Sequence, residues 1–411
     1  MDSSLKEFII DKLDSSAHRL RHHNGLTIGL EQEFFLLQKS SKSPATHEES
    51  QNFLLEISKQ PSWYIREKSF DVLGEMISRV SYEESNGRYT TIKYDHHPHL
   101  IEIAFSYHAN LFELDKRVQS VFNTLKSVAE YLGLEISTQS ILQISTSDAR
   151  VTSPLADFEK LRHYRSLLFK NRGQDPNSEH VNYAAGIAAT QTHIGNTHWW
   201  LAPNYVDSLY CLEPYILPLS KHLSKLEGAG EELFIKRWAG YQAVFQGFPL
   251  VGFPKMKNWT IDNWIHALIN SPLSGNRSDL WAGKTLSEIK TMPFQSWQEF
   301  FACVRDMQII RPRLYGTLEF RADPALQDPK NIICLTALRL GICSYLVKTY
   351  AMNDIFNFEK AQRKWWDNIA HKASQLPKPI IELALRGLKD RQLGEEKYLA
   401  RLTTLSYKDC T

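Results

Sequence analysis

The stretch Leu26–Leu37, with the sequence LTIGLEQEFFLL, predicts a β-strand because β-branched and aromatic residues follow Gly25 and end at the polar run QKSSKSPATHEES. Glu31 and Glu33 are two residues apart and therefore project from the same face of this strand. The opposite face carries a mostly apolar set: Leu30, Gln32, Phe34 and Leu36. The strand is thus predicted to have a core side and an acidic side.

Two carboxylates on one strand face repel each other unless a cation joins them. Hard divalent cations prefer oxygen ligands, and Mg²⁺ held by carboxylates usually also contacts substrate phosphates. Glu31 and Glu33 are therefore candidate metal ligands. The alternative is a half-exposed edge strand with solvated acids.

A second candidate site lies in the run LIEIAF, where Glu102 interrupts a sequence suited to a buried strand. A buried carboxylate needs a partner. Asp95 precedes it by a stretch in which Pro98 favours a bend, so Asp95 and Glu102 are expected at one site.

The run QTHIG places Gln191 and His193 on one face of a predicted strand, over Asn182–Asn196, and Gly195 leaves room for a ligand near the backbone. A single histidine is more often structural than functional. His193 is therefore a candidate ligand only in combination with the acidic strands.

The stretch Arg311–Arg321, with the sequence RPRLYGTLEFR, is the most informative part of the chain. In the strand predicted over Leu314–Arg321, Glu319 and Arg321 share one face with Thr317. Taken in isolation, Glu319 and Arg321 could simply form an ion pair on one face of the strand. A carboxylate for metal and arginines for phosphate are, however, what phosphoryl transfer requires.

The other predicted elements are mainly helical. An apolar stripe predicts a helix over Leu111–Leu132 that ends at Gly133, and further helices are expected at Leu155–Leu168, Tyr205–Leu226 and Trp297–Met307 and from about residue 331 onward. A short strand is predicted at Leu134–Gln143, and irregular structure, typical of a substrate lid, over residues 246–296. Strands and helices alternate without regular βαβ spacing, which favours an α+β fold with an antiparallel sheet.

Composition narrows the class of protein. A chain of 411 residues with 43% hydrophobic residues can bury a large core, and a net charge of +2 gives no electrostatic indication of nucleic-acid binding. Five scattered cysteines without a CxxC pair argue against a disulfide framework or a zinc site. The N-terminus lacks the pattern of a signal peptide, and the apolar run Ile332–Val347 contains Arg339 and is short for a membrane span. A cytoplasmic protein without membrane association is expected.

The ordered motifs GLEQE, HLIEIAF, QTHIG and RPRLYGTLEFRADP closely resemble the glutamate-cysteine ligase and carboxylate-amine ligase family, whose fold is related to that of glutamine synthetase. The matches cover about 50 residues between positions 25 and 325, and the helical C-terminal quarter matches only loosely. The resemblance implies one catalytic domain over residues 1–411, with an antiparallel sheet curved into a half-barrel funnel.

The resemblance also implies roles for individual residues. Metal ligands are expected at six positions: Glu31, Glu33, Asp95, Glu102, His193 and Glu319. Arg321 is expected to neutralise the transferring phosphate, Arg311 and Arg313 to contact substrate or phosphate, and Gln191 and His193 to lie at the nucleotide. The implied cofactors are ATP and roughly two or three Mg²⁺ ions, with Mn²⁺ as a substitute.

The implied reaction joins a glutamate-like carboxylate to a cysteine-like amine through an acyl phosphate, as in glutathione biosynthesis, and a homo-oligomer is compatible with it. His96, His97 and His99, the pair His198-Trp199 and the segment 246–296 depart from the family pattern. Three alternatives remain: a metallohydrolase with His97, His99, His193 and His198 as zinc ligands, a non-catalytic ligand-binding homologue, and an enzyme that phosphorylates a guanidine or amine.

Overall fold

The computed structural model describes most of the chain in thirteen stretches. These are residues 2–20, 25–71, 74–84, 87–95, 97–137, 186–224, 249–253, 259–273, 283–289, 295–304, 306–326, 328–349 and 378–403, together with isolated residues at 142, between 163 and 175, and at 281, 363, 364 and 367. The predicted helix Leu155–Leu168, the strand residues 182–185 and His96 lie outside the described residues or are described only in part.

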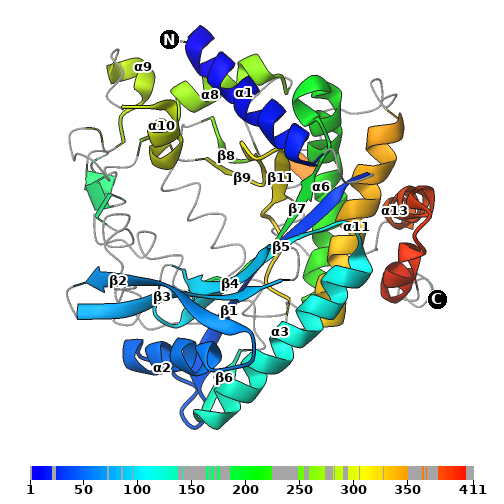
Figure 1. Ribbon diagram of the computed structural model, residues 1–411. Coiled ribbons are helices and arrows are strands. Elements are labelled where there is room, and N and C mark those ends of the chain that lie inside the picture. The colour runs from blue at the N-terminus through cyan, green and yellow to red at the C-terminus, as the bar shows by residue number, and fades with distance from the viewer. Residues whose placement is uncertain are drawn as a thin grey trace.

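The central feature is a nine-stranded sheet in the order β10-β11-β7-β1-β5-β4-β3-β2, with β6 paired to one end of β1. All of its pairings are antiparallel, and it does not close into a barrel (Figure 1). The predicted α+β class is confirmed, whereas the half-barrel funnel stays a prediction. The strands are β1 (Thr27–Gln38), β2 (Trp63–Asp71), β3 (Gly74–Glu83), β4 (Tyr89–Tyr94), β5 (Leu100–His108), β6 (Leu134–Ile136), β7 (Thr190–Gly195), β10 (Ile310–Pro312) and β11 (Thr317–Phe320).

The strand predicted from LTIGLEQEFFLL is β1, which lies in the middle of the sheet between β5 and β7. Its register places Glu31 opposite Gln191 of β7 and Glu33 opposite Glu102 of β5. The edge-strand alternative for the acidic pair is therefore wrong, because β1 is paired on both sides. Four motifs that are far apart in the sequence meet on neighbouring strands.

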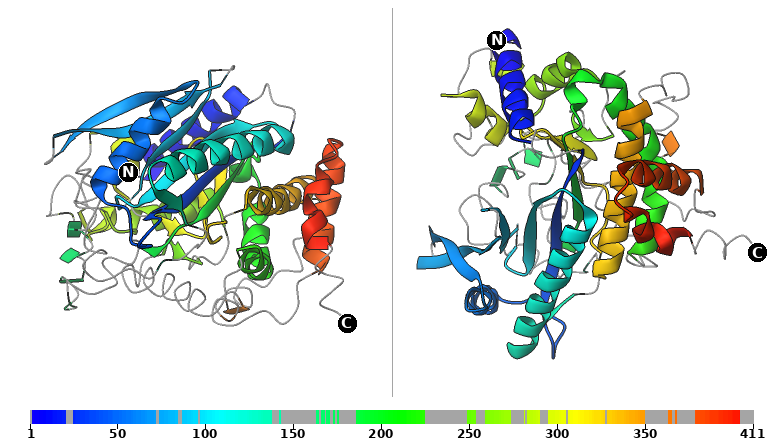
Figure 2. Two further views of the ribbon diagram at one scale, coloured as in Figure 1. Left: turned by 90° about the horizontal axis from the view of Figure 1, so that it is seen from below. Right: turned by 45° about the vertical axis from the view of Figure 1, so that its right-hand side comes forward.

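Helices cover the apolar face of the sheet (Figures 1 and 2). Helix α3 packs against β5 and β6, α2 against β2 and β3, and α11 against β7, while α13 lies on the outer side of α11. The helices and short 3₁₀ turns are α1 (Asp2–Leu20), α2 (His47–Ser58), α3 (Leu111–Tyr131), η2 (Trp199–Leu201), α6 (Pro203–Leu223), α8 (Ile261–Ile269), α9 (Leu286–Ile289), α10 (Trp297–Cys303), α11 (Pro329–Thr349), α13 (Lys378–Arg391) and η4 (Glu395–Leu399).

Helix α3 shows why its sequence forms a helix at these bounds. The side chain of Asn110 accepts a hydrogen bond from the Glu113 backbone N–H (2.9 Å) and so caps the first turn. The chain leaves the helix through Gly133, whose φ of +70° is readily adopted only by glycine. The predicted apolar stripe is buried along the helix, so the prediction for Leu111–Leu132 is confirmed.

Several predicted element boundaries are wrong. The strand predicted over Leu134–Gln143 is β6 and ends at Ile136, and the strand predicted over Asn182–Asn196 is β7, with the bounds Thr190–Gly195. The helix predicted over Trp297–Met307 ends at Cys303, because Val304 is extended (φ −69°, ψ 139°) and bridges to Leu273, and Met307 belongs to the short parallel pair of β8 (Val251–Gly252) and β9 (Met307–Gln308). The strand predicted over Leu314–Arg321 begins only at Thr317.

The first residues of that predicted strand form a tight turn instead. The Gly316 N–H donates to the Arg313 carbonyl (2.9 Å), and the Arg313 N–H donates to the Thr317 carbonyl (2.9 Å). Gly316 has a φ of +83°, which favours glycine at this point. The turn joins β10 and β11 into a hairpin and brings the Arg-Pro-Arg run beside Glu319.

The segment 246–296 is less irregular than its composition predicts. Thr260 accepts a hydrogen bond from the Asn263 N–H (3.1 Å) and begins α8, which buries an apolar face, and α9 follows later in the segment. The abundance of Gly, Pro, Trp, Asn and Ser in this segment predicted irregular structure, but at α8 a good cap and a helical spacing of apolar residues outweigh that composition. The proposed lid lies partly outside the described residues and stays a prediction.

One described helix, α11, is long and apolar enough to cross a membrane by length and composition. It is longer than the apolar run read from the sequence, but 78% of its most apolar window is buried inside the protein, as in a core helix. The four described cysteines, Cys211, Cys303, Cys334 and Cys343, are buried and form no disulfide within the described part of the chain.

Helices α11 and α13 cross at two glycines. A Cβ atom on Gly387 would lie 1.8 Å from the carbonyl oxygen of Gly341, and one on Gly341 would lie 2.3 Å from the carbonyl oxygen of Ala384. These neighbours are backbone atoms and cannot rotate away. The crossing therefore requires glycine on both helices.

Gly387→Ala should destabilise the protein by about 1–3 kcal/mol, because the extra methyl group forces the two helices apart. The exposed neighbour Arg386 on the same helix provides the control, since Arg386→Ala removes no buried contact. Urea denaturation of both variants measures the difference. Equal stability of Gly387→Ala and the wild type would show that the helices separate without cost.

Candidate functional site

A polar surface runs across the sheet on the side opposite helices α3 and α11. It is formed by alternate residues of neighbouring strands, because cross-strand partners project from the same face. In the observed register these residues are Lys93 and Glu102 on β4 and β5, Glu31 and Glu33 on β1, Gln191 and His193 on β7, and Glu319 with Arg311 on β11 and β10. We call this set the polar face.

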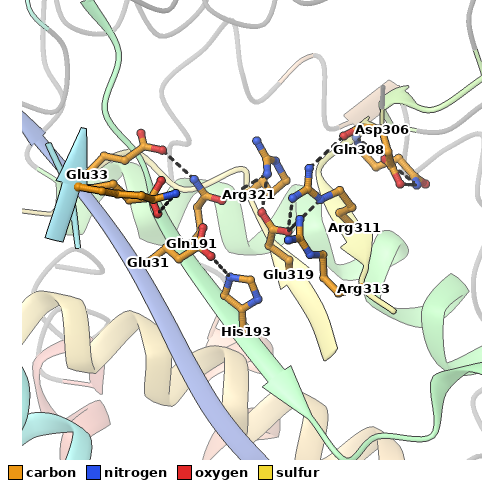
Figure 3. A network of polar contacts seen from close by, with 12 residues as sticks. Glu31, Glu33, Gln191, His193, Asp306, Gln308, Arg311, Arg313, Glu319 and Arg321 are labelled. Atoms are coloured by element: carbon orange, nitrogen blue, oxygen red, sulfur yellow. Dashed lines mark hydrogen bonds and ion pairs between the residues drawn. The ribbon is translucent and has the colours of Figure 1, made fainter. Parts of the chain in front are cut away.

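Glu319 is the most enclosed member of the polar face, with no exposed side-chain surface. Its Oε2 accepts hydrogen bonds from Arg311 Nε (2.9 Å) and Arg313 Nη1 (3.1 Å), and its Oε1 accepts one from Arg321 (Figure 3). Burial opposes ionisation, but Arg321 and Arg313 hold the pKa of Glu319 below its ordinary value. The three arginines that the sequence singled out thus converge on one carboxylate.

Gln191 links this arginine cluster to β1. Its amide nitrogen donates to Glu33 Oε1 (2.8 Å), and its amide oxygen accepts from Arg321 Nη1 (3.3 Å). The other oxygen of Glu33 accepts from the Ala189 backbone N–H (2.8 Å). Gln191 therefore orients Arg321, and Glu33 orients Gln191.

His193 faces Glu31 across the β1–β7 ladder. Its Nε2 lies 3.4 Å from Glu31 Oε1 but is a buried nitrogen without a well-formed hydrogen bond. Burial would raise the pKa of Glu31, but the neighbouring His193 and Arg313 lower it below its ordinary value. Gly29, the cross-strand partner of His193, makes room for the imidazole, because a Cβ there would lie 3.2 Å from His193 Cβ.

These side chains fit a divalent cation. Glu31, His193 and Glu319 each offer one ligand atom, and the three atoms lie within 4.8 Å of one another. The poorly satisfied Nε2 of His193 points to the same conclusion. Two carboxylates and one imidazole suit Mg²⁺ or Mn²⁺ with further oxygen ligands from phosphate or water. Within the described part of the chain, this is the one group of three such residues that the structure brings together.

The remaining predicted ligands lie beside this group. Glu102 is buried opposite Glu33, and Lys93 Nζ lies 3.0 Å from Glu102 Oε1. Burial and repulsion from Glu31 raise the pKa of Glu102 to about 8, even though Lys93 opposes the shift. Asp95 contributes to the same repulsion, so it lies near Glu102 as predicted. Glu33, Asp95 and Glu102 do not join the three-residue group, and their role as ligands stays a prediction.

The histidines of the metallohydrolase alternative do not assemble around one point. His97 and His99 are buried and stack on each other with ring centroids 5.6 Å apart, and His99 lies against Phe35. His198 lies against Trp200, with ring centroids 5.2 Å apart. Among the described residues, only His193 of the proposed set belongs to a group of metal-ligating side chains.

A cavity of about 440 Å³ opens beside the three-residue group. Glu31, His193 and Thr317 lie on its wall, and the remaining lining residues are Ser16, Thr27, Gly29, Leu30, Ala104, Phe105, Tyr107 and Tyr315. Tyr107 and Tyr315 are 40% and 43% exposed. The cavity therefore combines apolar and aromatic walls with polar groups on one side, which is typical of a small-molecule site.

Several of these lining residues were not among the candidate site residues. Thr317 shares a strand face with Glu319, and its buried hydroxyl oxygen has no hydrogen-bond partner among the described residues. Ser16 reaches the cavity from helix α1, far away in the sequence, where its hydroxyl donates to the Leu314 carbonyl (3.2 Å). Strand parity already placed Thr317 on the face of Glu319 and Arg321 but gave it no role, and no local pattern could have identified Ser16.

Comparisons with known proteins yield structural neighbours only. No protein-family model and no curated protein sequence matches the chain. A bifunctional glutathione synthetase from Pasteurella multocida aligns at 12% identity with a TM-score of 0.40, over 98% of this chain and 50% of its own, so the present chain spans about half its length. The glutamate-cysteine ligase of Francisella tularensis, solved in complex with AMP, aligns at 11% identity with a TM-score of 0.43, over 93% of this chain and 82% of its own.

One of these two neighbours is itself a glutamate-cysteine ligase, the family that the sequence motifs resemble. Similarity at this level does not assign a reaction or a substrate to this chain.

Glu319→Gln should weaken Mn²⁺ binding by at least about tenfold, because an amide is a poorer ligand than a carboxylate. Calorimetric titration with Mn²⁺ measures the affinity, and circular dichroism checks the fold. The matched control is Glu84→Gln, since Glu84 is a buried carboxylate that accepts hydrogen bonds from Thr90 (3.1 Å) and Ser106 (2.7 Å) and lies outside the three-residue group. Equal affinity in Glu319→Gln and the control would remove Glu319 from the metal site.

Proposed function

We propose that this protein is an ATP-dependent carboxylate-amine ligase that works with a divalent cation and resembles glutamate-cysteine ligase in its substrates. The observation that carries the proposal is the convergence of Glu31, His193 and Glu319 with three arginines beside a cavity of about 440 Å³. A cation site adjoining guanidinium groups suits a polyphosphate, whose oxygens both can bind. The proposal includes a single catalytic domain and the half-barrel funnel.

Charge is unevenly distributed along the polar face in a way that suits this chemistry. Arg311, Arg313 and Arg321 lie at one end, on and after β10 and β11, whereas Glu33 and Glu102 lie at the other. The three-residue group lies between them. The arginine end is placed to bind phosphate oxygens, and the carboxylate end is placed to bind further cations.

The reaction proceeds in two displacement steps. A substrate carboxylate oxygen attacks the γ-phosphorus of ATP, the bond to the β-phosphate oxygen breaks, and ADP leaves. The amine nitrogen then attacks the acyl carbon, the bond between that carbon and the phosphate oxygen breaks, and inorganic phosphate and a proton are released. A bound divalent cation would neutralise phosphate charge in this reaction.

The chain's own residues supply orientation and charge. Arg321, held by Gln191 and Glu319, is positioned to stabilise the charge on the transferring phosphate. The cavity beside Glu31 and His193 suits the nucleoside portion of ATP, with Tyr315 and Tyr107 as aromatic walls at its rim. Arg313, whose guanidinium lies 5.1 Å from the centre of the Tyr315 ring, links this wall to the phosphate site.

Phosphate release from Mg-ATP in the presence of glutamate, with and without cysteine and other amines, tests the proposal directly. We expect release that depends on both a carboxylate and an amine, and mass spectrometry should identify an amide product. A phosphorylated guanidine or amine as the product would favour the phosphotransfer alternative. Folded protein that binds zinc tightly and releases no phosphate under any combination would exclude the ligase.

Arg321→Lys should lower kcat by at least about 100-fold, because an ammonium group cannot bind Gln191, Glu319 and phosphate in one planar arrangement. The matched control is Arg79→Lys on β3, where Arg79 pairs with Glu67 on the surface (3.1 Å). Steady-state kinetics with unchanged melting temperatures would separate this effect from unfolding. Near-normal kcat in Arg321→Lys would reduce the Arg321–Glu319 contact to a structural ion pair.

A further inference from the structure

A second group of charged residues lies buried on the helix side of the sheet. Glu213 of α6, Asp323 just after β11 and Arg339 of α11 are 0%, 0% and 1% exposed. Arg339 Nη2 donates to Asp323 Oδ1 (2.9 Å), its Nε donates to Asp323 Oδ2 (3.1 Å), and its Nη1 and Nη2 donate to the two oxygens of Glu213. We call these three residues the buried triad.

The buried triad is a costly way to fill a core. Removing charges from water costs several kcal/mol per ion, and apolar residues of similar size often replace buried ion pairs without loss of stability. Two carboxylates share one guanidinium here, so the carboxylates also repel each other. A planar guanidinium that donates two hydrogen bonds to one carboxylate, in contrast, fixes the relative orientation of the two side chains. The triad therefore fixes the relative orientation of the three parts of the chain that it joins: α6, α11 and the segment after β11.

The triad holds the strand that carries Glu319 and Arg321. Asp323 is two residues beyond Arg321, and the guanidinium carbon of Arg339 lies 4.7 Å from the centre of the Phe320 ring. Phe320 projects to the helix side, whereas its neighbours Glu319 and Arg321 lie on the polar face. Arg339 thus contacts β11 at Phe320, the residue between Glu319 and Arg321, from the opposite side of the sheet.

Hydrogen bonds donated by backbone N–H groups connect the segment around Asp323 to β7 and to the residue before β10. The Thr190 N–H donates to the Asp323 carbonyl (3.3 Å), and the Leu326 N–H donates to Thr190 Oγ1 (3.0 Å). The Arg321 N–H donates to the Ile309 carbonyl (2.8 Å). Thr190 directly precedes Gln191, so the segment around Asp323 sets the position of both groups that bind the Arg321 side chain.

Helix α6 holds the other side of the hairpin. The hydroxyl of Tyr210, one turn before Glu213, lies 2.5 Å from the Ile310 carbonyl and 2.9 Å from Gln308 Oε1. The carbonyl of Asp306, which precedes Gln308 by two residues, accepts a hydrogen bond from Arg311 Nη1 (3.4 Å). One helix therefore contacts β10 through Tyr210 and reaches the segment after β11 through Glu213 and Arg339.

We propose that Glu213, Asp323 and Arg339 form a positioning network that fixes the segment from Glu319 to Asp323 and thereby aims the Arg321 guanidinium at the transferring phosphate. For its chemistry this rests on the proposed function. The three residues do not contact the cavity or the metal-ligating group, so they act through Arg321 and not on the substrate. A small displacement of a group that stabilises the reaction is sufficient to lower the rate strongly.

Asp323→Asn tests the network, because it keeps the shape of the side chain, removes one of the two repelling carboxylate charges and breaks the fork with Arg339. We expect kcat to fall about 10- to 100-fold with KM for the carboxylate within about twofold and little change in melting temperature. Glu213→Gln should cause a smaller loss, because Asp323 and Arg339 still pair. The matched control is Glu395→Gln in the other buried pair, Arg391–Glu395 (2.6 Å), which should lower stability without lowering kcat.

Hydrogen exchange supplies a readout that does not depend on any enzymatic activity. In Asp323→Asn the amides of Thr190, Arg321 and Leu326 should exchange faster, while those of β3 and β4 should not change. Faster exchange with normal kcat would reduce the triad to a structural device and overturn the proposal. Equal loss of kcat in Glu395→Gln would also overturn it, by showing a general effect of destabilisation.

The exchange measurement also separates this proposal from the proposed function. If the wild type shows no ATP-dependent turnover, the ligase assignment fails, and the exchange rates still decide whether Asp323 fixes the β11 segment. Unchanged exchange at Thr190, Arg321 and Leu326 in Asp323→Asn overturns the network whether or not the wild type is active.

Discussion

The site depends on one interaction, the enclosure of the Glu319 carboxylate by Arg311, Arg313 and Arg321. An ionised carboxylate without exposed surface costs roughly several kcal/mol unless it is paired and hydrogen-bonded. Three guanidinium groups more than meet that requirement, so positive charge is left over beside Glu31 and His193. The same contact stabilises the fold and, under the proposed function, supplies the guanidinium groups that would bind phosphate oxygens.

This interaction exists because of the tight turn at Gly316. The turn folds β10 back on β11 and places Arg311 directly opposite Glu319, while Arg313 reaches the same carboxylate from the start of the turn. Arg321 approaches along the strand, since residues two apart share a face. A single hairpin of about a dozen residues therefore supplies both the acid and its three partners.

Strand parity accounts for the part of the site that could be predicted from the sequence. Because side chains alternate with a period of two, Glu31 with Glu33, Gln191 with His193 and Glu319 with Arg321 could each be assigned to one face. The order of strands could not be predicted in this way, since pairing between β1 and β7 depends on contacts between residues more than 150 positions apart. The proximity of Glu31 to His193, and the link from Glu33 through Gln191 to Arg321, are consequences of that register. The helix predicted to reach Met307 fails for a related reason: Val304 pairs with distant Leu273, and a window of local sequence contains no information about that partner.

The distribution of charge follows from the same register and supports the proposal that a cation and a polyanion bind together on this surface. At the β4–β5–β1 end, burial of Glu102, together with repulsion from Glu31, raises the pKa of Glu102 even though Lys93 is in contact with it. At the β10–β11 end, guanidinium groups outnumber the carboxylate that they surround. A bound cation alone would offset only the repulsion between Glu102 and Glu31. A bound anion alone would offset only the excess positive charge of the three arginines. A polyphosphate with its divalent cations satisfies both, and the group Glu31–His193–Glu319 lies where the two ends meet.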